Sequence, residues 1–357
     1  MKILSVVGAR PQFIKAAVVS RALKAADICE VMVHTGQHYD ANMSAVFFTE
    51  LDLSPPQHHL GISQLSHGAM TGRMLEQLEQ LLQAEKPDYV LVYGDTNSTL
   101  AGALAAAKLD IPVAHVEAGL RSFNRQMPEE INRVLTDQLA SLLFTTSLQA
   151  SQNLHKEGIQ QGVYQVGDVM YDAVLQFLPQ AERISLTERF DLNSGSYGLV
   201  TLHRQENTAT SESLSQWLRP LAELAEILPL VFPVHPRTRA LLNQSFADWR
   251  PPGIQLLEPV SYFEMLALQR QARVILTDSG GLQKEAFYLR VPCLTLRAET
   301  EWVETVDLGW NHLLGAHPAR LCEAAQRVLS APAPVASQTV YGVGDAAVKI
   351  ARCLQNV

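Results

Sequence analysis

Residues 2–15 read KILSVVGARPQFIK, a short apolar run that leads through a turn into a helical pattern. The run Lys2–Val7 has the length of a buried strand, and the helical pattern covers Phe13–Ala26. Strand, turn and helix in this order form the repeating unit of parallel α/β sheets. In open sheets of this kind, ligands bind at the edge where the strands end. The stretch therefore predicts an α/β fold with Arg10 and Lys15 at its ligand-binding edge.

The same alternation continues along the chain in two series. The first series predicts strands at Lys2–Val7, Cys29–His34, Tyr89–Tyr93, Pro112–Val116 and Leu142–Thr145, with helices at Gly68–Glu85, Ser98–Lys108 and Glu129–Ala140. The second series predicts strands at Tyr197–Leu202, Leu230–Val234, Ile254–Leu257, Arg273–Thr277 and Pro292–Leu296. The run Leu100–Ala107 is rich in alanine with one glycine, which suits close packing of a helix on a sheet.

The length of 357 residues and the polar stretch 175–196 between the two series predict two domains. We expect both to be Rossmann-like, doubly wound α/β domains that face each other across a cleft. The expected boundary lies near Gly167, so that the domains cover residues 1–167 and 168–342, with Asp168–Gln180 as a linker helix. The last helical pattern, Gly344–Cys353, would let residues 343–357 pack back on the first domain.

The composition is that of a globular chain without excess positive charge. It has 28 Lys and Arg against 36 Asp and Glu, a formal net charge of −8, so we expect neither nucleic acid nor an anionic membrane as a partner. The four cysteines are scattered without a Cys-x-x-Cys pair, as is typical of reduced thiols in a cytoplasmic chain. We find no signal-peptide core and no apolar stretch of 18 residues, and expect a cytoplasmic protein without a membrane span.

Short charged segments follow the apolar runs and mostly precede helical patterns. They are Gly8–Lys15, Gly94–Thr96, His115–Arg121, Pro128–Arg133, His203–Asn207 and Asp278–Glu285. Cations and carboxylates at the ends of parallel strands suit an anionic, phosphate-bearing substrate with acid/base chemistry beside it.

Two of these segments are candidates for binding phosphate. Arg10 and Lys15 stand at the start of the first helix, where cations oppose the helix dipole unless an anion lies there. The segment Asp278-Ser279-Gly280-Gly281 ends a strand and opens a helix, so its amides and the Ser279 hydroxyl can approach a phosphate. Glu285, about one turn further, is within reach of ribose hydroxyls. The plainer alternatives are a solvated first turn and an ordinary helix cap.

Asp95, Glu117 and Glu129 are the candidates for acid/base chemistry. Asp95 and Glu117 each follow a strand, and Glu129 opens a helix. Glu117 lies in an apolar His-Val-Glu-Ala-Gly setting, so we expect it to be buried, which raises the pKa of a carboxyl towards neutrality. Glu130 and Glu206 are interpreted as helix caps or surface charges.

His203 and Arg204 follow the strand that opens the second series, and His235 follows the next strand. A lone histidine is more often structural, but two at successive strand ends favour contact with a ligand. The remaining histidines form no ligand-spaced set and His-Glu-x-x-His is absent, so we expect no metal site. The nucleophile motifs Gly-x-Ser-x-Gly and Ser-x-x-Lys are absent as well.

Taken together, these segments resemble the non-hydrolysing UDP-N-acetylglucosamine 2-epimerases of bacteria, over almost the whole chain and in the same order. The resemblance implies the two-domain GT-B fold, no cofactor, a UDP-sugar substrate, a role in making surface polysaccharide precursors, and a homodimer. It also implies Arg10 and Lys15 on the phosphates, and Asp95 and Glu117 in proton transfer at the sugar. Glu129 corresponds to the first Glu of the family's Pro-Glu-Glu segment. His203 would lie beside the pyrophosphate, and Ser279, Gly280, Gly281 and Glu285 would form the UDP cradle and ribose contact.

The reaction implied by the resemblance expels UDP from C1 and removes the proton on C2, which leaves a 2-acetamidoglycal. UDP then adds back while a proton arrives on the opposite face of C2. Which carboxylate acts on which face stays open.

The chain departs from the family pattern at several positions. Gln12 and Lys284 stand where glutamates are usual, and Glu301-Trp302-Val303-Glu304 replaces Glu-Arg-Pro-Glu. Residues 37–44 differ from the stretch that forms an allosteric substrate site in some members, which leaves that regulation open. These variants, with residues 66–73, are similar to the branch that acts on UDP-2,3-diacetamido-2,3-dideoxyglucuronate. Loss of acidic side chains would ease binding of an extra carboxylate, so both substrates stay open, with UDP-N-acetylglucosamine preferred as the commoner one.

Three other functions compete with this interpretation. A glycosyltransferase on the same fold would need an acceptor site, whereas the three carboxylates favour proton transfer. A protein that only binds nucleotide sugars would not need those carboxylates. A hydrolysing epimerase often carries a fused kinase domain, for which this sequence has no room.

Overall fold

The computed structural model describes residues 1–37, 48–315, 317–332, 334, 335 and 339–357. These residues divide into two compact units, Met1–Leu175 with Gln338–Val357, and Gln176–Ser337. The allosteric stretch considered above, residues 37–44, lies mostly outside the described residues.

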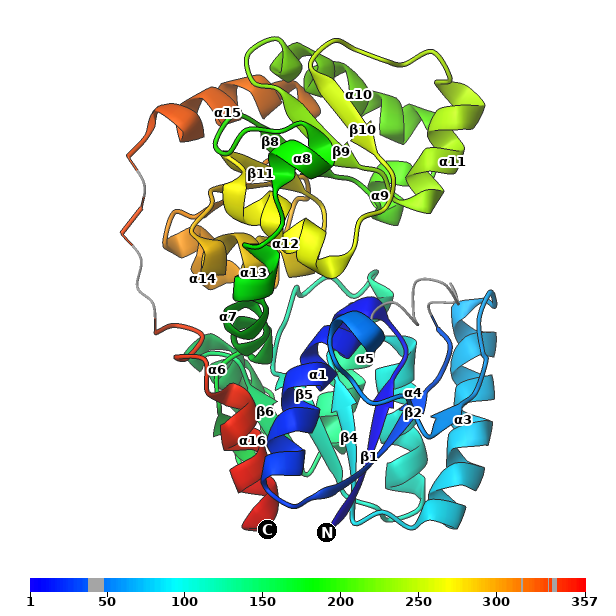
Figure 1. Cartoon of the computed structure of the whole chain (residues 1–357). Helices are drawn as coiled ribbons and strands as arrows, with labels where there is room; N and C mark the ends of the chain where they lie inside the picture. Colours follow the sequence, from blue (N-terminus) through cyan, green and yellow to red (C-terminus); the bar gives the residue numbers. More distant parts are fainter. Residues whose placement is uncertain (38–47, 316, 333, 336–338) are drawn as a thin grey trace. The chain divides into compact units, whose positions relative to one another are not determined.

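The described part of unit 1 is built on a seven-stranded parallel sheet of order β3-β2-β1-β4-β5-β6-β7. Its strands are β1 Lys2–Val7, β2 Cys29–His34, β3 His58–His59, β4 Tyr89–Tyr93, β5 Val113–Ala118, β6 Leu142–Thr145 and β7 Val163–Gln165. Its helices are α1 Arg10–Ala25, α3 His67–Glu85, α4 Asn97–Lys108, α5 Pro128–Leu139, α6 Leu148–Lys156 and α16 Ala346–Gln355, and α7 Val169–Ala181 runs from unit 1 into unit 2. Figure 1 shows α16, in red, beside α1, in blue.

Unit 2 repeats the pattern with a six-stranded parallel sheet among its described residues, of order β10-β9-β8-β11-β12-β13. The strands are β8 Gly198–Thr201, β9 Leu230–Pro233, β10 Ile254–Leu257, β11 Val274–Thr277, β12 Cys293–Thr295 and β13 Asn311–Leu313. The helices are α8 Leu186–Phe190, α9 Gln205–Thr208, α10 Ser211–Ala225, α11 Pro236–Ser245, α12 Tyr262–Gln271, α13 Gly280–Leu289, α14 Val303–Asp307 and α15 Leu321–Ser330, with a 3₁₀ turn at Pro318–Arg320.

Both sheets confirm the predicted α/β class, and their strand order is that of the Rossmann fold. The central strand β4 is apolar along its whole length because helices cover both faces of the sheet, and four of its five residues are buried. The predicted close packing of α4 is also confirmed. A Cβ on Gly102 would lie 3.1 Å from side-chain atoms of Val6 and Val92, so the small residue lets the helix approach the sheet.

The strands that the sequence did not predict are the shortest ones. β3, β7 and β13 have two or three residues each, too few to form a recognisable alternation. They extend the edges of sheets whose centres were predicted. In each unit the strand order reverses next to the first strand, between β1 and β4 in unit 1 and between β8 and β11 in unit 2. These switch points are where doubly wound sheets bind ligands.

No helix among the described residues is long and apolar enough to cross a membrane.

Candidate functional site

The turn after β1 is tied to the turn after β4 by the side chain of Gln12. Its amide oxygen accepts hydrogen bonds from the backbone N–H groups of Gly8 and Ala9, at 2.8 and 3.0 Å. Its amide nitrogen donates to the carbonyl of Tyr93 at 2.7 Å. Gln12 is 2% exposed, so its amide serves the fold and does not face open space. Arg10 is the first residue of α1 and is partly buried.

Lys15 and Glu117 form a buried ion pair at the switch point of unit 1. The Lys15 ammonium contacts the Glu117 carboxylate, and the two side chains are 7% and 6% exposed. The expected burial of Glu117 is confirmed, and the ammonium offsets the cost of removing its charge from water. Gly94 closes the pair in from the β4 side, since a Cβ there would lie 3.2 Å from Glu117 Oε2 and 3.5 Å from Lys15 Nζ.

Glu117 owes its orientation to an irregularity in β5. The pairing with β6 runs from Val116–Phe144 to Ala118–Thr145, so Glu117 is an extra, bulged residue. Its φ is +77°, a left-handed conformation that costs a non-glycine residue of order 1–3 kcal/mol. Bulges redirect side chains and are frequent next to active sites.

Asp95 lies just after β4 and pairs with Arg133 of α5. Arg133 also donates to Glu130 Oε2 at 2.9 Å, and its own side chain is 3% exposed while that of Asp95 is 30% exposed. Asn132 Nδ2 donates to the Asp95 carbonyl at 2.9 Å. The pair leaves Asp95 partly open to solvent, with its position set by α5. Glu129 stands in the first turn of the same helix and is partly buried.

Glu130, interpreted from the sequence as a helix cap or a surface charge, is not a surface charge. Glu130 is 1% exposed and accepts hydrogen bonds from the backbone N–H groups of Ser122 and Phe123, at 2.9 and 3.0 Å. It therefore fixes the loop after β5, because a buried carboxylate is stable only where donors surround it. Glu206, by contrast, is exposed in the first turn of α9, as predicted.

In unit 2 the carboxylate of Asp278, just after β11, holds the turn after β8 through several hydrogen bonds. It accepts from the backbone N–H groups of His203 and Arg204, each at 3.0 Å, and from Asn207 Nδ2 at 3.0 Å. The His203 ring lies 3.3 Å from the same carboxylate and is 35% exposed. His235 caps α11, and the centre of its ring lies 5.6 Å from the centre of the His203 ring. The two histidines predicted from successive strand ends are therefore neighbours.

The N-terminus of α13 has the features of an anion-binding site. Ser279 is its N-cap residue, yet its side chain makes no capping hydrogen bond to the helix. Gly281 has little around it, because within the described ranges the only atom beyond its neighbours and its own helix backbone near a Cβ there would be Ser279 Oγ at 3.9 Å. On the other side, a Cβ on Gly280 would lie 2.7 Å from Glu301 Oε1, so a larger residue here would displace the Glu301 side chain. Helix amides with little covering them favour a phosphate group.

Further along α13, Lys284 and Glu285 are buried. Glu285 is 4% exposed and accepts a hydrogen bond of 2.6 Å from Gln269 Nε2, so part of its carboxylate is occupied within the protein. Lys284 is 1% exposed and its ammonium lies 3.9 Å from the centre of the Trp302 ring. This cation–π contact joins two of the positions at which the sequence departs from the family pattern.

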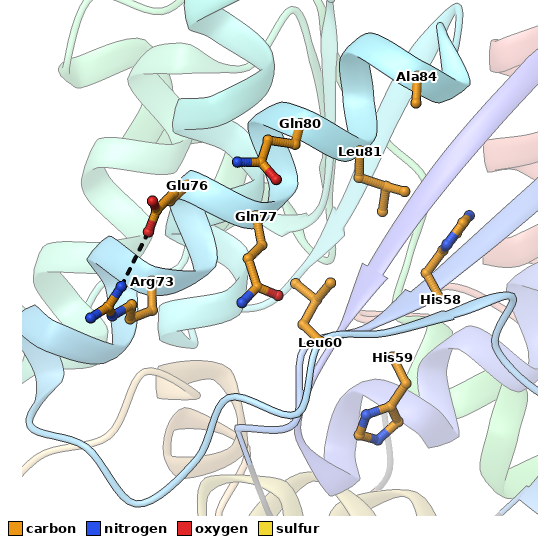
Figure 2. Close-up of a pocket in the computed structure, with 9 residues that line it drawn as sticks. All are labelled: His58, His59, Leu60, Arg73, Glu76, Gln77, Gln80, Leu81 and Ala84. Carbon is orange, nitrogen blue, oxygen red and sulfur yellow. Dashed lines mark hydrogen bonds and ion pairs between the residues drawn. The ribbon is translucent and has the colours of Figure 1, made fainter.

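A separate hollow of about 620 Å³ lies between β3 and α3 (Figure 2). It is lined by His58, His59, Leu60, Arg73, Glu76, Gln77, Gln80, Leu81 and Ala84. None of these is a predicted site residue, and the hollow lies away from the switch point. The chemistry indicated by the sequence therefore does not coincide with it. No three His, Cys, Asp or Glu side chains within the described ranges are placed to hold a metal ion.

The predicted site residues are thus divided between the two units. Unit 1 carries Arg10, Lys15, Asp95, Glu117 and Glu129, and unit 2 carries His203, Arg204, His235, Ser279, Gly280, Gly281 and Glu285. The roles of these residues stay predictions.

The sequence interpretation missed two buried residues of α5, Arg133 and Asp137. Their spacing from Glu130, at i+3 and i+7, was a usable signal, because it places three charges on one helix face.

Comparison with known proteins agrees with the resemblance seen in the sequence. A family model described as UDP-N-acetylglucosamine 2-epimerase matches residues 21–355. A Methanococcus maripaludis protein named a UDP-N-acetylglucosamine 2-epimerase homolog is 48% identical over the whole of both chains. The Pseudomonas aeruginosa UDP-2,3-diacetamido-2,3-dideoxy-D-glucuronate 2-epimerase is 47% identical over 99% of both. The crystal structure of the Methanocaldococcus jannaschii UDP-GlcNAc 2-epimerase, in complex with UDP-GlcNAc and UDP, superposes with a TM-score of 0.94 at 43% identity and covers 100% of both chains. This chain belongs to the UDP-N-acetylglucosamine 2-epimerase family.

Proposed function

We propose that this protein is a non-hydrolysing UDP-N-acetylglucosamine 2-epimerase that interconverts UDP-N-acetylglucosamine and UDP-N-acetylmannosamine. The observation that carries the proposal is the buried Lys15–Glu117 pair on the bulged end of β5, next to the turn that bears Asp95. Carboxylates held at fixed positions beside cations suit proton transfer at a carbon whose neighbour loses an anionic leaving group.

The leaving group must be stabilised before the proton can move. The hydrogen on C2 is weakly acidic, so cleavage of the C1–O bond leads and negative charge develops on the diphosphate. Arg10, His203 and Arg204 supply cations or polar groups for that charge, and Ser279 with the amides at 280 and 281 supplies hydrogen-bond donors. His235 is a further contact on the same side. Glu285 is assigned to the ribose hydroxyls.

Asp95, Glu117 and Glu129 are assigned to the proton transfers at C2. One carboxylate takes the C2 proton as the C1–O bond breaks, which gives the 2-acetamidoglycal and UDP. In the return step UDP adds to C1 while another carboxylate delivers a proton to the opposite face of C2. Lys15 contacts Glu117 and is suited to a second role on the phosphates. No cofactor is needed for this cycle.

A second substrate, UDP-2,3-diacetamido-2,3-dideoxyglucuronate, is supported by the 47% identity to the Pseudomonas aeruginosa enzyme that is named for it. The proposed chemistry at C1 and C2 is the same. Lys284 is a buried cation at a position where the family usually has a glutamate, which favours an additional negative charge on the ligand. Gln12 is a weaker argument, because its amide is occupied by the backbone.

The resemblance also leads us to propose a homodimer in the cytoplasm that supplies precursors for surface polysaccharides. These expectations are independent of the chemistry at C2 and would be measured by light scattering and by cell fractionation.

The decisive experiment incubates the protein with each UDP-sugar in deuterium oxide, without an acceptor. The epimerase proposal requires deuterium at C2 and formation of the C2 epimer. Release of free sugar with UDP would instead indicate hydrolysis. A sugar nucleotide that stays unlabelled and is consumed only after an acceptor is added would indicate a transferase and contradict the proposal. The UDP-sugar that is labelled with the higher kcat/KM is the substrate.

The variant Glu117→Gln tests the role of this carboxylate, because it keeps the shape of the side chain but cannot accept a proton. We expect C2 exchange to fall by about 10²–10⁴-fold, the usual contribution of a general acid or base, while UDP binds within a few-fold. Equal losses of exchange and UDP binding would show that Glu117 has only a structural role.

A further inference from the structure

The strained conformation of Glu117 has to be maintained by its surroundings. A residue at φ +77° in a bulge persists only where neighbouring contacts determine its backbone on both sides. The contacts on the two sides of Glu117 converge on one side chain, the carboxylate of Asp137 in α5.

Each oxygen of Asp137 holds one flank of the bulge. Oδ1 accepts from Nδ1 of His115, two residues before Glu117, at 2.7 Å. Oδ2 accepts from the backbone N–H of Gly119, two residues after it, at 3.1 Å, and from Arg121 Nη1 at 2.7 Å. Asp137 is 1% exposed, so its carboxylate spans the bulge from inside the protein.

His115 extends this connection to the neighbouring strand end. Its Nε2 lies 2.7 Å from the carbonyl oxygen of Gly94, the residue before Asp95. Its two ring nitrogens thus face the Asp137 carboxylate and the Gly94 carbonyl. Gly94 is also held through its own N–H, which donates to the Val116 carbonyl at 3.0 Å. The turns that carry Asp95 and Glu117 are thereby linked to each other.

The far side of the network is anchored on α6. Arg121 makes two hydrogen bonds to the carboxylate of Glu157, at 2.8 and 2.6 Å. Gly119 accepts a hydrogen bond from Asn153 at 3.0 Å, and a Cβ on Gly119 would clash with the carbonyl of Ala150. Burial acts to raise the pKa of Asp137, but His115 and Arg121 together lower it below the usual value, so the carboxylate is ionised.

We propose that Asp137 is a positioning residue that holds Glu117, and through His115 the turn before Asp95, in the geometry needed for proton transfer at C2. The proposal rests on the proposed epimerase function. Asp137 is buried and does not touch the substrate itself. Its effect on the reaction passes through the bulge, where displacement by about 1 Å is enough to cost roughly 10²-fold in rate.

The test is Asp137→Asn. An amide can accept on one oxygen only, so its NH₂ group meets the donors of either His115 or Gly119, and one flank of the bulge is released. We expect kcat for C2 exchange to fall about 10²-fold, with UDP binding changed less than about threefold. Leu82→Ala is the control, because it opens a cavity under α3 in the same unit and lowers the melting temperature without touching the bulge.

The double variant Asp137→Asn/Glu117→Gln separates positioning from general loss of stability. If Asp137 acts through Glu117, the double variant exchanges C2 hydrogen within about threefold of Glu117→Gln alone. A further 10²-fold loss in the double variant, or an Asp137→Asn enzyme no slower than Leu82→Ala, would overturn the proposal.

Two further results keep the test decisive. If Asp137→Asn does not fold, His115→Gln takes its place, and the same saturation with Glu117→Gln is required of it. A wild-type protein that exchanges no C2 hydrogen would refute the proposed function itself. An active wild type with a fully active Asp137→Asn would refute only the role of Asp137.

Discussion

Asp172 in α7 is a single residue whose protonation is coupled to the folding of unit 1. Its Oδ2 accepts a hydrogen bond of 2.8 Å from the N–H of Ala347, in the first turn of α16. The pKa of Asp172 is raised to about 6, mainly by burial and also by the charges of Asp168 and Asp345, while the amides of Ala347 and Ala346 oppose the shift. The folded chain therefore binds this proton more tightly than the unfolded chain does.

The sign of the pH dependence follows from that difference. Between about pH 4 and pH 6 the folded state holds more protons on Asp172, so the free energy of unfolding falls as the pH rises through this range. Asp172→Asn removes the effect, and we expect its free energy of unfolding to rise relative to wild type by about 1–3 kcal/mol from pH 4 to pH 7. Urea unfolding of both proteins at several pH values measures this. A difference that stays constant with pH would contradict it.

At the scale of one element, α5 buries charged side chains and exposes apolar ones, the reverse of an ordinary surface helix. Its charged residues Glu130, Arg133 and Asp137 are at most 2% exposed, whereas Ile131 and Leu135 are 41% and 45% exposed. The charged face is stable towards the sheet because Glu130 and Asp137 receive donors from β5, from the loop after β5 or from Arg133. Arg133 in turn donates to Asp95, just after β4.

This inversion predicts opposite responses at two neighbouring positions. Arg133→Met leaves Glu130 and Asp95 without their partner and should lower the free energy of unfolding by about 3–5 kcal/mol, as for a broken buried ion pair. Leu135→Gln on the outer face should change it by less than about 1 kcal/mol. Chemical denaturation followed by circular dichroism compares the two. Similar losses would show that the outer face of α5 is as important as the inner one.

At the scale of the whole chain, the C-terminal helix belongs to unit 1. α16 packs on α1, and Gln355 Nε2 donates to the Ala26 carbonyl at 2.8 Å. Ile350 and Leu354 are fully buried, whereas Val348 on the same helix is 45% exposed. The first and last helices of the chain therefore share one apolar interface within one unit.

Damage to this interface should lower the melting temperature of unit 1 alone. Ile350→Asn buries an amide and leaves a cavity, which should cost about 3 kcal/mol or more and lower the unit 1 transition by roughly 6–12 °C. Val348→Asn is the matched control and should shift it by less than about 3 °C. Scanning calorimetry of the two variants and the wild type measures the shifts. Equal shifts for Ile350→Asn and Val348→Asn would contradict the role of this interface.

Local pattern in the chain was enough to predict the α/β class and the order of the central strands and helices, and it led to the proposed site residues. The reason is that apolar periodicity and turn residues act over a few neighbours, as in residues 2–15. A two-residue strand such as β3 is too short to show such a pattern, and it was not predicted.

Contacts between distant segments decided the rest. The left-handed bulge at Glu117 depends on β6, and its support depends on Asp137, 20 positions further along the chain. Likewise Gln12 is engaged by Tyr93 and Lys284 lies against Trp302, contacts between distant segments that the local sequence did not predict. Such pairings set which polar groups are buried together, and burial, which controls the strength of charge interactions, exists only once the chain has folded.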